Sequence, residues 1–374
     1  MEESAVSTND PLNVFGFKLK QEIVQQSDFN PALLNDPDAI DNYSTKLQVQ
    51  QPVFNLDGFM GRNALKNRFK AAEAQTKRTQ YYTVFMVKKT YYQLVLAKRR
   101  VEVIDSALTV ARTNRKQARD FYEQGMINKA DFLAADVRVK ELETEQTQAA
   151  NGVENQADGL RYMLDLSDDV SLIPTDGLEY QGVPAASYDF GQINEQRSDM
   201  KALRYQLNAS RSNLNAMRFR FLPSLNVFGS YEWNDQTLFG TKADNYMIGA
   251  TLKWNLFSGY ENVGSVEQAS AQLSKMKLAY EQRSFRNRID IMKAERAIKQ
   301  AQRQIELTRS AMRQAEEHLR IRRNRFEKGM EKTTDVLMAE TQLSEARLKH
   351  LQALFQLNVS TAQLELLLEK DLSR

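Results

Sequence analysis

The chain has 374 residues, 26% of them charged, and a net charge of only +3 at neutral pH; positive and negative residues are interspersed, which does not indicate a nucleic-acid-binding protein. It has no cysteine and two histidines, so it cannot form disulfides or thiolate metal sites and has little with which to build a histidine-based site. Without a glycine-rich phosphate loop or a nucleophile elbow, the sequence predicts no enzyme, and we expect no catalytic residue, cofactor or metal site.

The first 42 residues are expected to form mostly loop. The N-terminus MEESAVSTND has neither the basic nor the apolar segment of a signal peptide, and SDFNPALLNDPDAIDN is rich in Asn, Asp and Pro. A short helix is predicted within residues 16–26. Residues 43–54 alternate in hydrophobicity with a period of two, which predicts a strand whose outward side chains are Tyr43, Thr45, Leu47, Val49 and Val53.

Two very long stretches predict helices. Residues 62–124 and 265–328 contain neither Gly nor Pro, and each run ends at a glycine, Gly125 or Gly329. As helices they would be roughly 95 Å long at 1.5 Å per residue, far beyond the average helix of a globular protein. A second helical run of about 35 residues follows each glycine, ending near Leu166 or Leu368. The pattern therefore predicts two long helical hairpins.

The two hairpins form an internal repeat with an offset of 204 residues. The turn YEQGMINKADFL begins at Tyr122, and FEKGMEKTTDVL begins at Phe326 with Glu, Gly, Met, Asp and Leu at the same spacing. We divide the chain accordingly. Residues 1–175 form a first repeat with a loop, a strand and a hairpin, and residues 176–374 form a second repeat with a helix near 192–219, two strands and a hairpin.

The two strands of the second repeat are predicted at residues 222–234 and 246–256, which also alternate with a period of two. Their length, their terminal aromatic residues and a largely polar second face are typical of outer-membrane barrel strands, although a small soluble sheet with one buried face is the alternative. In lipid an open sheet edge leaves backbone groups unpaired, so several chains would have to close such a barrel together. The predicted outward side chains are Leu225, Val227, Gly229, Tyr231, Trp233, Tyr246, Ile248, Ala250, Leu252, Trp254 and Leu256.

The last predicted helix, residues 334–368, carries two seams of residues spaced by three or four positions on different sides. A helix of a dimeric coiled coil needs one seam, whereas a helix that packs against a neighbour on each side in a wall of helices needs two. An ordinary bundle helix with a wide apolar face is the alternative. The first seam is Leu343, Ala346, His350, Ala353, Leu357, Ser360 and Leu364, and the second is Ser344, Leu348, Leu351, Phe355, Asn358 and Ala362.

The ordered set of motifs resembles the TolC-like outer-membrane efflux proteins, the outer-membrane channels of tripartite efflux and type I secretion systems. The resemblance covers nearly the whole chain and rests on VFNLDGF at 53–59, LFSGY at 256–260, RSDMKAL at 197–203, FLPSL at 221–225 and the repeated turns. It implies a mainly α fold with a small β part, in which long helical hairpins form an α-barrel and four strands per protomer join a trimeric outer-membrane β-barrel.

The resemblance also implies a location and partners. The protein would lie in the outer membrane with its helices extending into the periplasm. Its partners would be two further copies of the chain, outer-membrane lipid, a periplasmic adaptor (membrane fusion) protein and an inner-membrane efflux pump or ABC transporter, with no nucleic acid. Its function would be an exit duct for efflux or secretion.

Compared with this family, the chain is expected to lack the signal peptide, the first helix and the first strand. The counterparts of residues 192–219 and 222–234 in the first repeat would fall largely before residue 1. We therefore expect a natural fragment or a mis-started reading frame with three strands. Its unpaired sheet edge would make this chain insert poorly into a membrane.

The resemblance places a periplasmic gate at the second turn, where acidic residues form rings. Asp335 falls on one acidic position and Met338 replaces the other, while Asp131 is the corresponding acid of the first turn. Phe326 and Glu331 stand where the family has the Tyr and Arg that latch the closed tip. Because Phe lacks the hydroxyl and Glu reverses the charge, we expect other contacts to hold the gate.

The same turns have simpler structural roles. Gly125 and Gly329 are expected to end their helices in the left-handed conformation, and Asp131 and Asp335 to cap or begin the helices that follow. Small and apolar residues at exposed turns would also suit a partner's helical hairpin. The predicted adaptor-docking residues are Tyr122, Gly125, Leu133, Phe326, Gly329 and Leu337.

A soluble or periplasmic coiled-coil scaffold, such as an adaptor-like hairpin protein, is the competing interpretation, because its long helices would look similar. The outward aromatic alternation of the three strands favours the channel, since a scaffold does not need it. The basic run RIRRNR, Arg320–Arg325, is interpreted as a solvated helix face.

Overall fold

The computed structural model describes residues 2–178 and 190–370. The contacts between residues divide the chain into two compact units, and each unit contains parts of both sequence repeats. The first unit comprises Met1–Phe69 and Tyr205–Lys277, and the second comprises Lys70–Arg204 and Leu278–Arg374.

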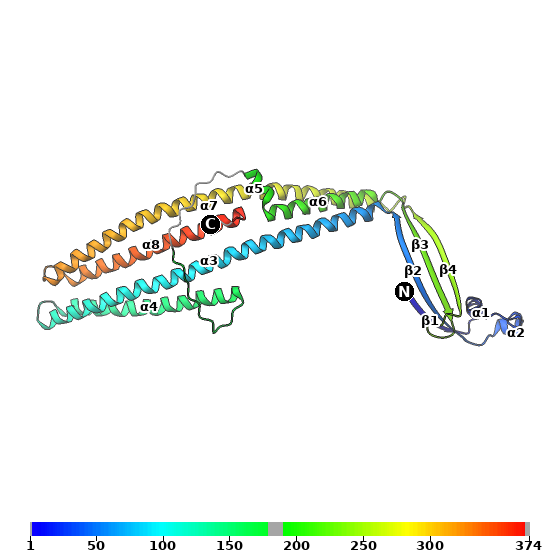
Figure 1. Cartoon of the computed structure of the whole chain (residues 1–374), viewed down its shortest axis with the longest axis horizontal. Coiled ribbons are helices and arrows are strands. Elements are labelled where there is room, and N and C mark those ends of the chain that lie inside the picture. Colours follow the sequence, from blue (N-terminus) through cyan, green and yellow to red (C-terminus); the bar gives the residue numbers. More distant parts are fainter. Residues whose placement is uncertain (1, 179–189, 371–374) are drawn as a thin grey trace. The chain divides into compact units, whose positions relative to one another are not determined.

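The first unit holds a four-stranded antiparallel sheet in the order β1-β2-β3-β4 (Figure 1). Short helices connect the first two strands, whereas a turn connects the last two. The strands are β1 (Glu2–Thr8), β2 (Ile40–Phe54), β3 (Ser224–Asp235) and β4 (Ala243–Lys253), and the connecting helices are α1 (Pro11–Lys20), the 3-10 helix η1 (Gln26–Phe29) and α2 (Pro31–Asn35).

Strand β1 corrects the expectation that the chain has only three strands. All seven of its residues pair with β2, ending with Thr8 opposite Ile40. The expectation of a mostly loop-like N-terminus is also wrong, because the Asn, Asp and Pro residues that indicate loops start helices here. Asp10 and Asn30 are N-caps, and a proline follows each at the first helical position. The argument for poor insertion from a three-stranded protomer therefore no longer applies.

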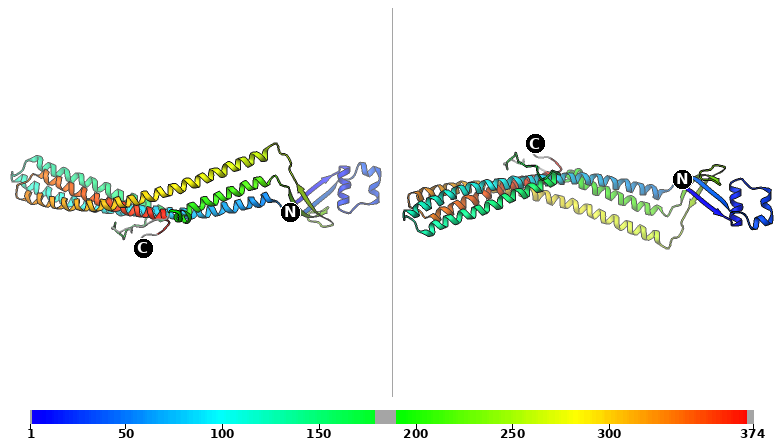
Figure 2. Two further views of the ribbon diagram at one scale, coloured as in Figure 1. Left: turned by 90° about the horizontal axis from the view of Figure 1, so that it is seen from above. Right: turned by 90° about the horizontal axis from the view of Figure 1, so that it is seen from below.

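The second unit is built from two helical hairpins, and both turns lie at the same end of this unit (Figures 1 and 2). The long helices and their lengths agree with the prediction, except that the helix expected near 192–219 is divided in two. No helix among the described residues is both long and apolar enough to cross a membrane. The helices of the chain that follow β2 are α3 (Leu56–Glu123), α4 (Lys129–Leu164), α5 (Phe190–Gln196), α6 (Ser198–Phe219), α7 (Glu261–Glu327) and α8 (Thr333–Leu368). The start of α3, most of α6 and the start of α7 belong to the first unit.

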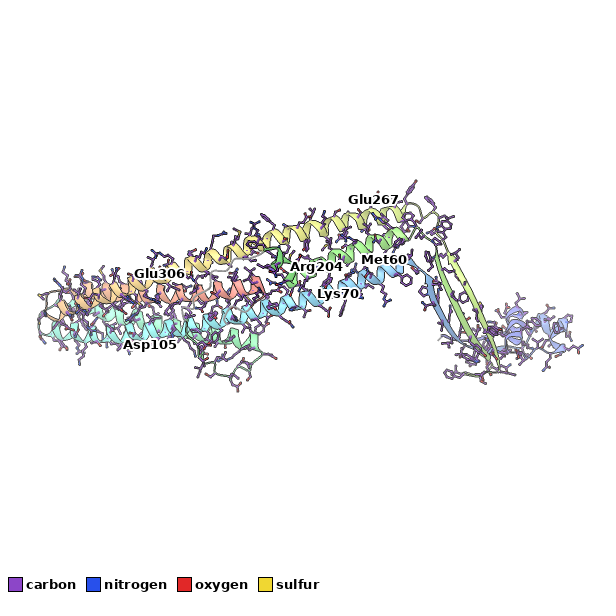
Figure 3. All side chains as sticks on the ribbon, turned by 45° about the horizontal axis from the view of Figure 1, so that its top comes forward. Met60, Lys70, Asp105, Arg204, Glu267 and Glu306 are labelled. Carbon is purple, nitrogen blue, oxygen red and sulfur yellow. The ribbon has the colours of Figure 1, made fainter. Side chains whose placement is uncertain are left out.

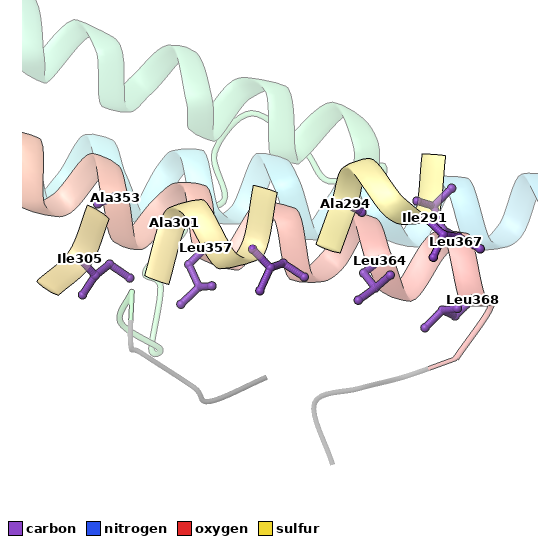
Figure 4. Packing of buried hydrophobic residues seen from close by; sticks show 10 residues of the cluster. Ile291, Ala294, Ala301, Ile305, Ala353, Leu357, Leu364, Leu367 and Leu368 are labelled. Carbon is purple, nitrogen blue, oxygen red and sulfur yellow. The ribbon is translucent and has the colours of Figure 1, made fainter. Parts of the chain in front are cut away.

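The core of the second hairpin is a row of small and branched residues between α7 and α8 (Figure 4). The α7 residues recur every three or four positions, so they share one face of the helix. Most of the first predicted seam of α8 is buried, whereas most of the second seam is half-buried. The buried cluster is Ile291, Ala294, Ile298, Ala301, Ile305, Ala353, Leu357, Leu364, Leu367 and Leu368.

Charged side chains such as the labelled Asp105 and Glu306 lie on the surfaces of the hairpins (Figure 3). Asp105 on α3 accepts a hydrogen bond from Gln146 on α4 at 2.6 Å. Glu306 on α7 pairs with Arg303 of the same helix at 2.7 Å. Such solvated pairs contribute little to stability, so the packing of the buried rows accounts for most of the stability of each hairpin.

Candidate gate and docking site at the hairpin turns

Both hairpin turns end their first helix in the same way. Gly125 has a φ of +73° and Gly329 a φ of +71°, in the left-handed region that favours glycine. The Met126 amide donates to the Phe121 carbonyl at 2.8 Å, and the Gly125 amide donates to the Tyr122 carbonyl at 2.9 Å. The same two bonds recur at the second turn. This pair of bonds is the Schellman motif, which confirms the predicted role of both glycines.

The two turns differ in how the next helix begins. The side chain of Asn128 accepts a hydrogen bond from the Asp131 amide at 2.9 Å and so caps α4. Lys332 occupies the equivalent position before α8, and no side chain caps that helix. Asp131 and Asp335 lie in the first turns of their helices, where a negative charge is favourable to the helix dipole. Both are therefore first-turn acids, as predicted.

Glu331 ties the second turn to two arginines of α7. Its Oε1 accepts a hydrogen bond from Arg322 at 2.6 Å, and its Oε2 accepts one from Arg325 at 2.8 Å. The side chain is only 7% exposed. Burial raises the pKa of Glu331, but the guanidinium hydrogen bonds outweigh it and hold this pKa below its ordinary value. The basic run is therefore more than a solvated face, since two of its members fix the turn.

Phe326 is buried, with 2% of its surface exposed. Its ring lies 5.4 Å from the ring of Phe121 on α3, so it packs one hairpin against the other. The expectation of an exposed Phe326 at the docking surface is therefore wrong, because its apolar ring finds an apolar partner within the chain. Phe326 lies instead where it can hold the two hairpins together near their turns.

The other predicted docking residues lie on the surface of the turns. Tyr122 is 39% exposed and stacks on Phe132 with the ring centres 6.0 Å apart. Leu133 is 47% exposed, Leu337 is half-buried and both glycines are exposed. The predicted gate residue Met338 is 61% exposed. Among the described residues, no group of three or more His, Cys, Asp or Glu side chains could hold a metal ion.

Glu340 is a buried acid near the turns that the sequence analysis missed. It lies on α8, is 7% exposed, and accepts a hydrogen bond from the side-chain amide of Asn114 on α3. Burial raises the pKa of Glu340 to about 7. The signal was present in the sequence, because one step of three residues back from Leu343 places Glu340 on the buried face.

A second buried network joins the start of α6 to α7 and to the end of α8. Arg197 is 1% exposed and donates to both carboxylate oxygens of Asp199, at 3.0 and 2.8 Å, and to the Leu367 carbonyl at 3.0 Å. Arg283 on α7 donates to Asp199 at 3.0 and 2.8 Å. Burial raises the pKa of Asp199, but the guanidinium groups hold it at about 2. The motif RSDMKAL contains this pair, although the sequence alone assigned it no role.

The fold is shared with solved outer-membrane channels. The match to the outer membrane protein VceC of Vibrio cholerae covers 100% of this chain and 87% of the VceC chain, with a TM-score of 0.80 and 18% identity. The CmeC channel of Campylobacter jejuni covers 100% and 78%, with a TM-score of 0.79 and 16% identity. The open state of the MtrE channel of Neisseria gonorrhoeae covers 100% and 80%, with a TM-score of 0.78 and 17% identity. Because these sequence identities are low, the structural similarity shows only that the fold is shared.

A search of curated proteins gives no match to this sequence. The sequence profile of one family, described as outer membrane efflux protein, matches residues 25–164 and 190–369, which is most of the chain. This match confirms the resemblance inferred from the repeated turns and the strand motifs, and the family consists of channels rather than enzymes. The chain therefore belongs to the outer membrane efflux protein family.

Proposed function

We propose that this chain is one protomer of a homotrimeric exit duct in the outer membrane, with helices that extend into the periplasm. The duct would receive its cargo from an inner-membrane efflux pump or ABC transporter through a periplasmic adaptor protein. The observation that carries this proposal is the division of the sheet into one apolar and one polar face.

The strand register brings the predicted outward side chains together. Leu47, Tyr231 and Tyr246 are paired across β2, β3 and β4, and the next row pairs Val49, Gly229 and Ile248. The apolar members of these rows are exposed, up to 77% for Ile248. A bulge after Pro52 shifts the register, so Phe54 rather than Val53 pairs with Leu225, which in turn pairs with Leu252. The rows of the other face are Lys46, Glu232 and Asn245, then Gln48, Ser230 and Met247.

Such a sheet fits a wall between lipid and water. Contiguous exposed apolar side chains mark an interaction surface, and strands with one apolar and one polar face are typical of outer-membrane barrels. Because backbone groups at an open edge are costly in lipid, four strands need further copies of the chain to close the wall. The family resemblance implies three copies.

A charge placed on either face of β4 tests this proposal. Ile248 and Met247 are neighbours near the middle of the strand, on opposite faces, and both are exposed. Ile248→Lys would place a charge in lipid at a cost of about 2–4 kcal/mol, so we expect much less trimer in the outer-membrane fraction. Met247→Lys faces the lumen and is the matched control. Equal effects of the two variants, or wild-type chain in the soluble fraction, would instead support a coiled-coil scaffold.

We propose Asp335 as the main charge of the periplasmic gate, with Asp131, Glu331, Phe326 and Met338 around it. The Glu331 charge is compensated by its two arginines. Asp335 is half-buried in the first turn of α8, and its carboxyl group contacts Glu331. Three copies of Asp335 in a trimer would form a negative ring that attracts cations.

Single-channel recordings test the ring. Asp335→Ala should reduce cation selectivity and weaken the block by multivalent cations, because three negative charges leave the constriction. Asp131→Ala, in the corresponding position of the first turn, is the matched comparison and should have a smaller effect. Unchanged selectivity and block in Asp335→Ala would refute the ring.

We propose that the turn residues Tyr122, Gly125, Leu133, Gly329 and Leu337 dock the adaptor, with Phe326 supporting them from beneath. Because the chain has no cysteine, a single cysteine at Asn128 or Lys332 would be a unique attachment point. We expect crosslinks from both positions to the adaptor encoded beside the gene. A cysteine at the exposed Glu306, on the shaft of α7, is the control. Crosslinking from the shaft but from neither turn would contradict the docking site.

A further inference from the structure

The contact between Asn114 and Glu340 joins the two hairpins of the chain. Asn114 is 3% exposed on α3 of the first hairpin, and Glu340 is 7% exposed on α8 of the second. The Asn114 side-chain nitrogen donates to Glu340 Oε1. The Oδ1 atom of Asn114 is buried and has no hydrogen-bond partner in the described part of the chain. A buried acceptor therefore lies beside a buried carboxyl group.

The cations around Glu340 form ion pairs with other acids, but the Nε atoms of Arg138 and Arg323 are buried and have no hydrogen-bond partner in the described part of the chain. Arg138 on α4 and Arg323 on α7 are close enough to influence its ionisation. Arg138 pairs with Glu141 at 3.2 Å, and Arg323 pairs with Glu327 at 3.8 Å, each within its own helix. On α3, the charged neighbour Arg115 pairs with Asp136 of α4 at 3.2 Å. Among the described residues no ion pair reaches Glu340.

We propose that Glu340 and Asn114 form a proton-dependent lock between the two hairpins, closed when Glu340 is neutral and released when it is ionised. The lock is a further part of the proposed gate, since it lies close to both turns. The role of the lock in the gate rests on the proposed function. The pH-dependent spacing of the hairpins does not, because it can be measured without any transport.

The chemistry of the two forms explains the direction. A neutral Glu340 can accept from the Asn114 amide and also donate its own proton to Asn114 Oδ1, which satisfies the buried acceptor with a second hydrogen bond. The ionised form cannot donate. It leaves Oδ1 unpaired beside a buried negative charge, and both features are unfavourable away from water. Raising the pH therefore weakens the contact.

Glu340 ionises near neutral pH. Burial raises the pKa of Glu340 to about 7, against an ordinary value of 4.5. Between these values the folded protein binds a proton that the unfolded chain has lost, so the contact is strongest at low pH and is lost as the pH rises through about 7. The hydrogen bond from Asn114 and the two arginines act in the opposite direction and limit the rise.

Distance measurements between spin labels test the lock. Lys116 on α3 and Gln342 on α8 are exposed, near the contact and on different hairpins. Cysteines at both sites would be the only ones in the chain. The labelled full-length chain, diluted with unlabelled chain, would be measured between pH 5 and 8.5. We expect the label distance to increase by about 2 Å or more, with a midpoint near pH 7.

Three variants make the result decisive. Glu340→Gln imitates the neutral acid and should keep the short distance at every pH. Asn114→Leu removes both hydrogen bonds and should lengthen the distance even at pH 5. Glu143→Gln changes a half-buried acid of α4 that pairs with Arg112 within the first hairpin and should leave the wild-type response intact. A wild-type distance that stays constant or shortens as the pH rises, or a response that survives in Glu340→Gln, would overturn the lock. Loss of outer-membrane trimers would instead refute the proposed function.

Discussion

Replacing Asp199 by Asn should loosen the region where α6 begins and α8 ends. The wild-type carboxylate accepts two hydrogen bonds from Arg197 and two from Arg283. Arg197 has no exposed side-chain surface, so the neutral amide would leave a buried cation without its counter-charge. Breaking a buried pair in this way costs about 3–5 kcal/mol.

The pKa of Asp199 gives an independent estimate. A pKa of about 2 in the folded protein, against an ordinary value of 3.8, corresponds to roughly 2 kcal/mol of stability at neutral pH. This value is smaller, as expected, because protonation leaves the hydrogen-bonding geometry in place. The sign follows from the lowered pKa. The contribution is complete above about pH 4 and is lost as the pH falls through the folded value of about 2.

Hydrogen exchange followed by mass spectrometry measures this loss locally. A loss of about 3 kcal/mol should speed exchange on the order of 100-fold in peptides from the start of α6 and the end of α8. Asp290→Asn is the matched control, because Asp290 pairs with Arg286 at 3.4 Å on a solvated part of α7 and should cost below about 1 kcal/mol. Similar exchange in the two variants would show that the network does not hold these helix ends together.

Two further sets of variants test the turns by the same exchange measurement. Gly329→Ala should destabilise the second turn by about 1–2 kcal/mol because the φ of Gly329 is +71°. Gly152→Ala is the control, since an added Cβ in the interior of α4 meets no atom within 4 Å there and should stabilise α4 by about 0.5–1 kcal/mol. An unchanged stability in Gly329→Ala would contradict the Schellman motif. Asn128→Ala should destabilise the start of α4 by about 1 kcal/mol, and Lys332→Asn should stabilise the start of α8 by a similar amount; equal exchange in Lys332→Asn and wild type would show that α8 gains nothing from a side-chain cap.

Much of the architecture could be predicted because its signals are local. The absence of Gly and Pro over long runs marked the helices, the glycines marked their ends, and the period of two marked β2, β3 and β4. The first strand was missed because seven residues beside an Asn- and Pro-rich stretch give too short a pattern. The end of β4 was placed too late, since Lys253 is its last residue.

The candidate site was less predictable because its contacts are distant in sequence. Phe326 meets Phe121 of the other hairpin, and a periodic pattern cannot say which helix a seam will face. Glu340 could be placed on the buried face of α8 by extending a seam, but its partner Asn114 lies 226 residues away. In the sequence, Arg197 and Asp199 look like the ordinary start of a helix, because their partners on α7 and at the end of α8 are distant in sequence.

The two turns show how a duplicated backbone can serve different purposes. Their Schellman hydrogen bonds are the same, so the backbone of the turn depends on the two glycines and hardly on the residues around them. The first turn is then completed by neutral contacts, the Asn128 cap and the stack of Tyr122 on Phe132. The second turn is completed by charges, with Glu331 between two arginines. Charged contacts respond to salt and pH, whereas neutral caps and stacked rings hardly do. The second turn is thus the one whose stability the surroundings can change, which is the property that a gate requires.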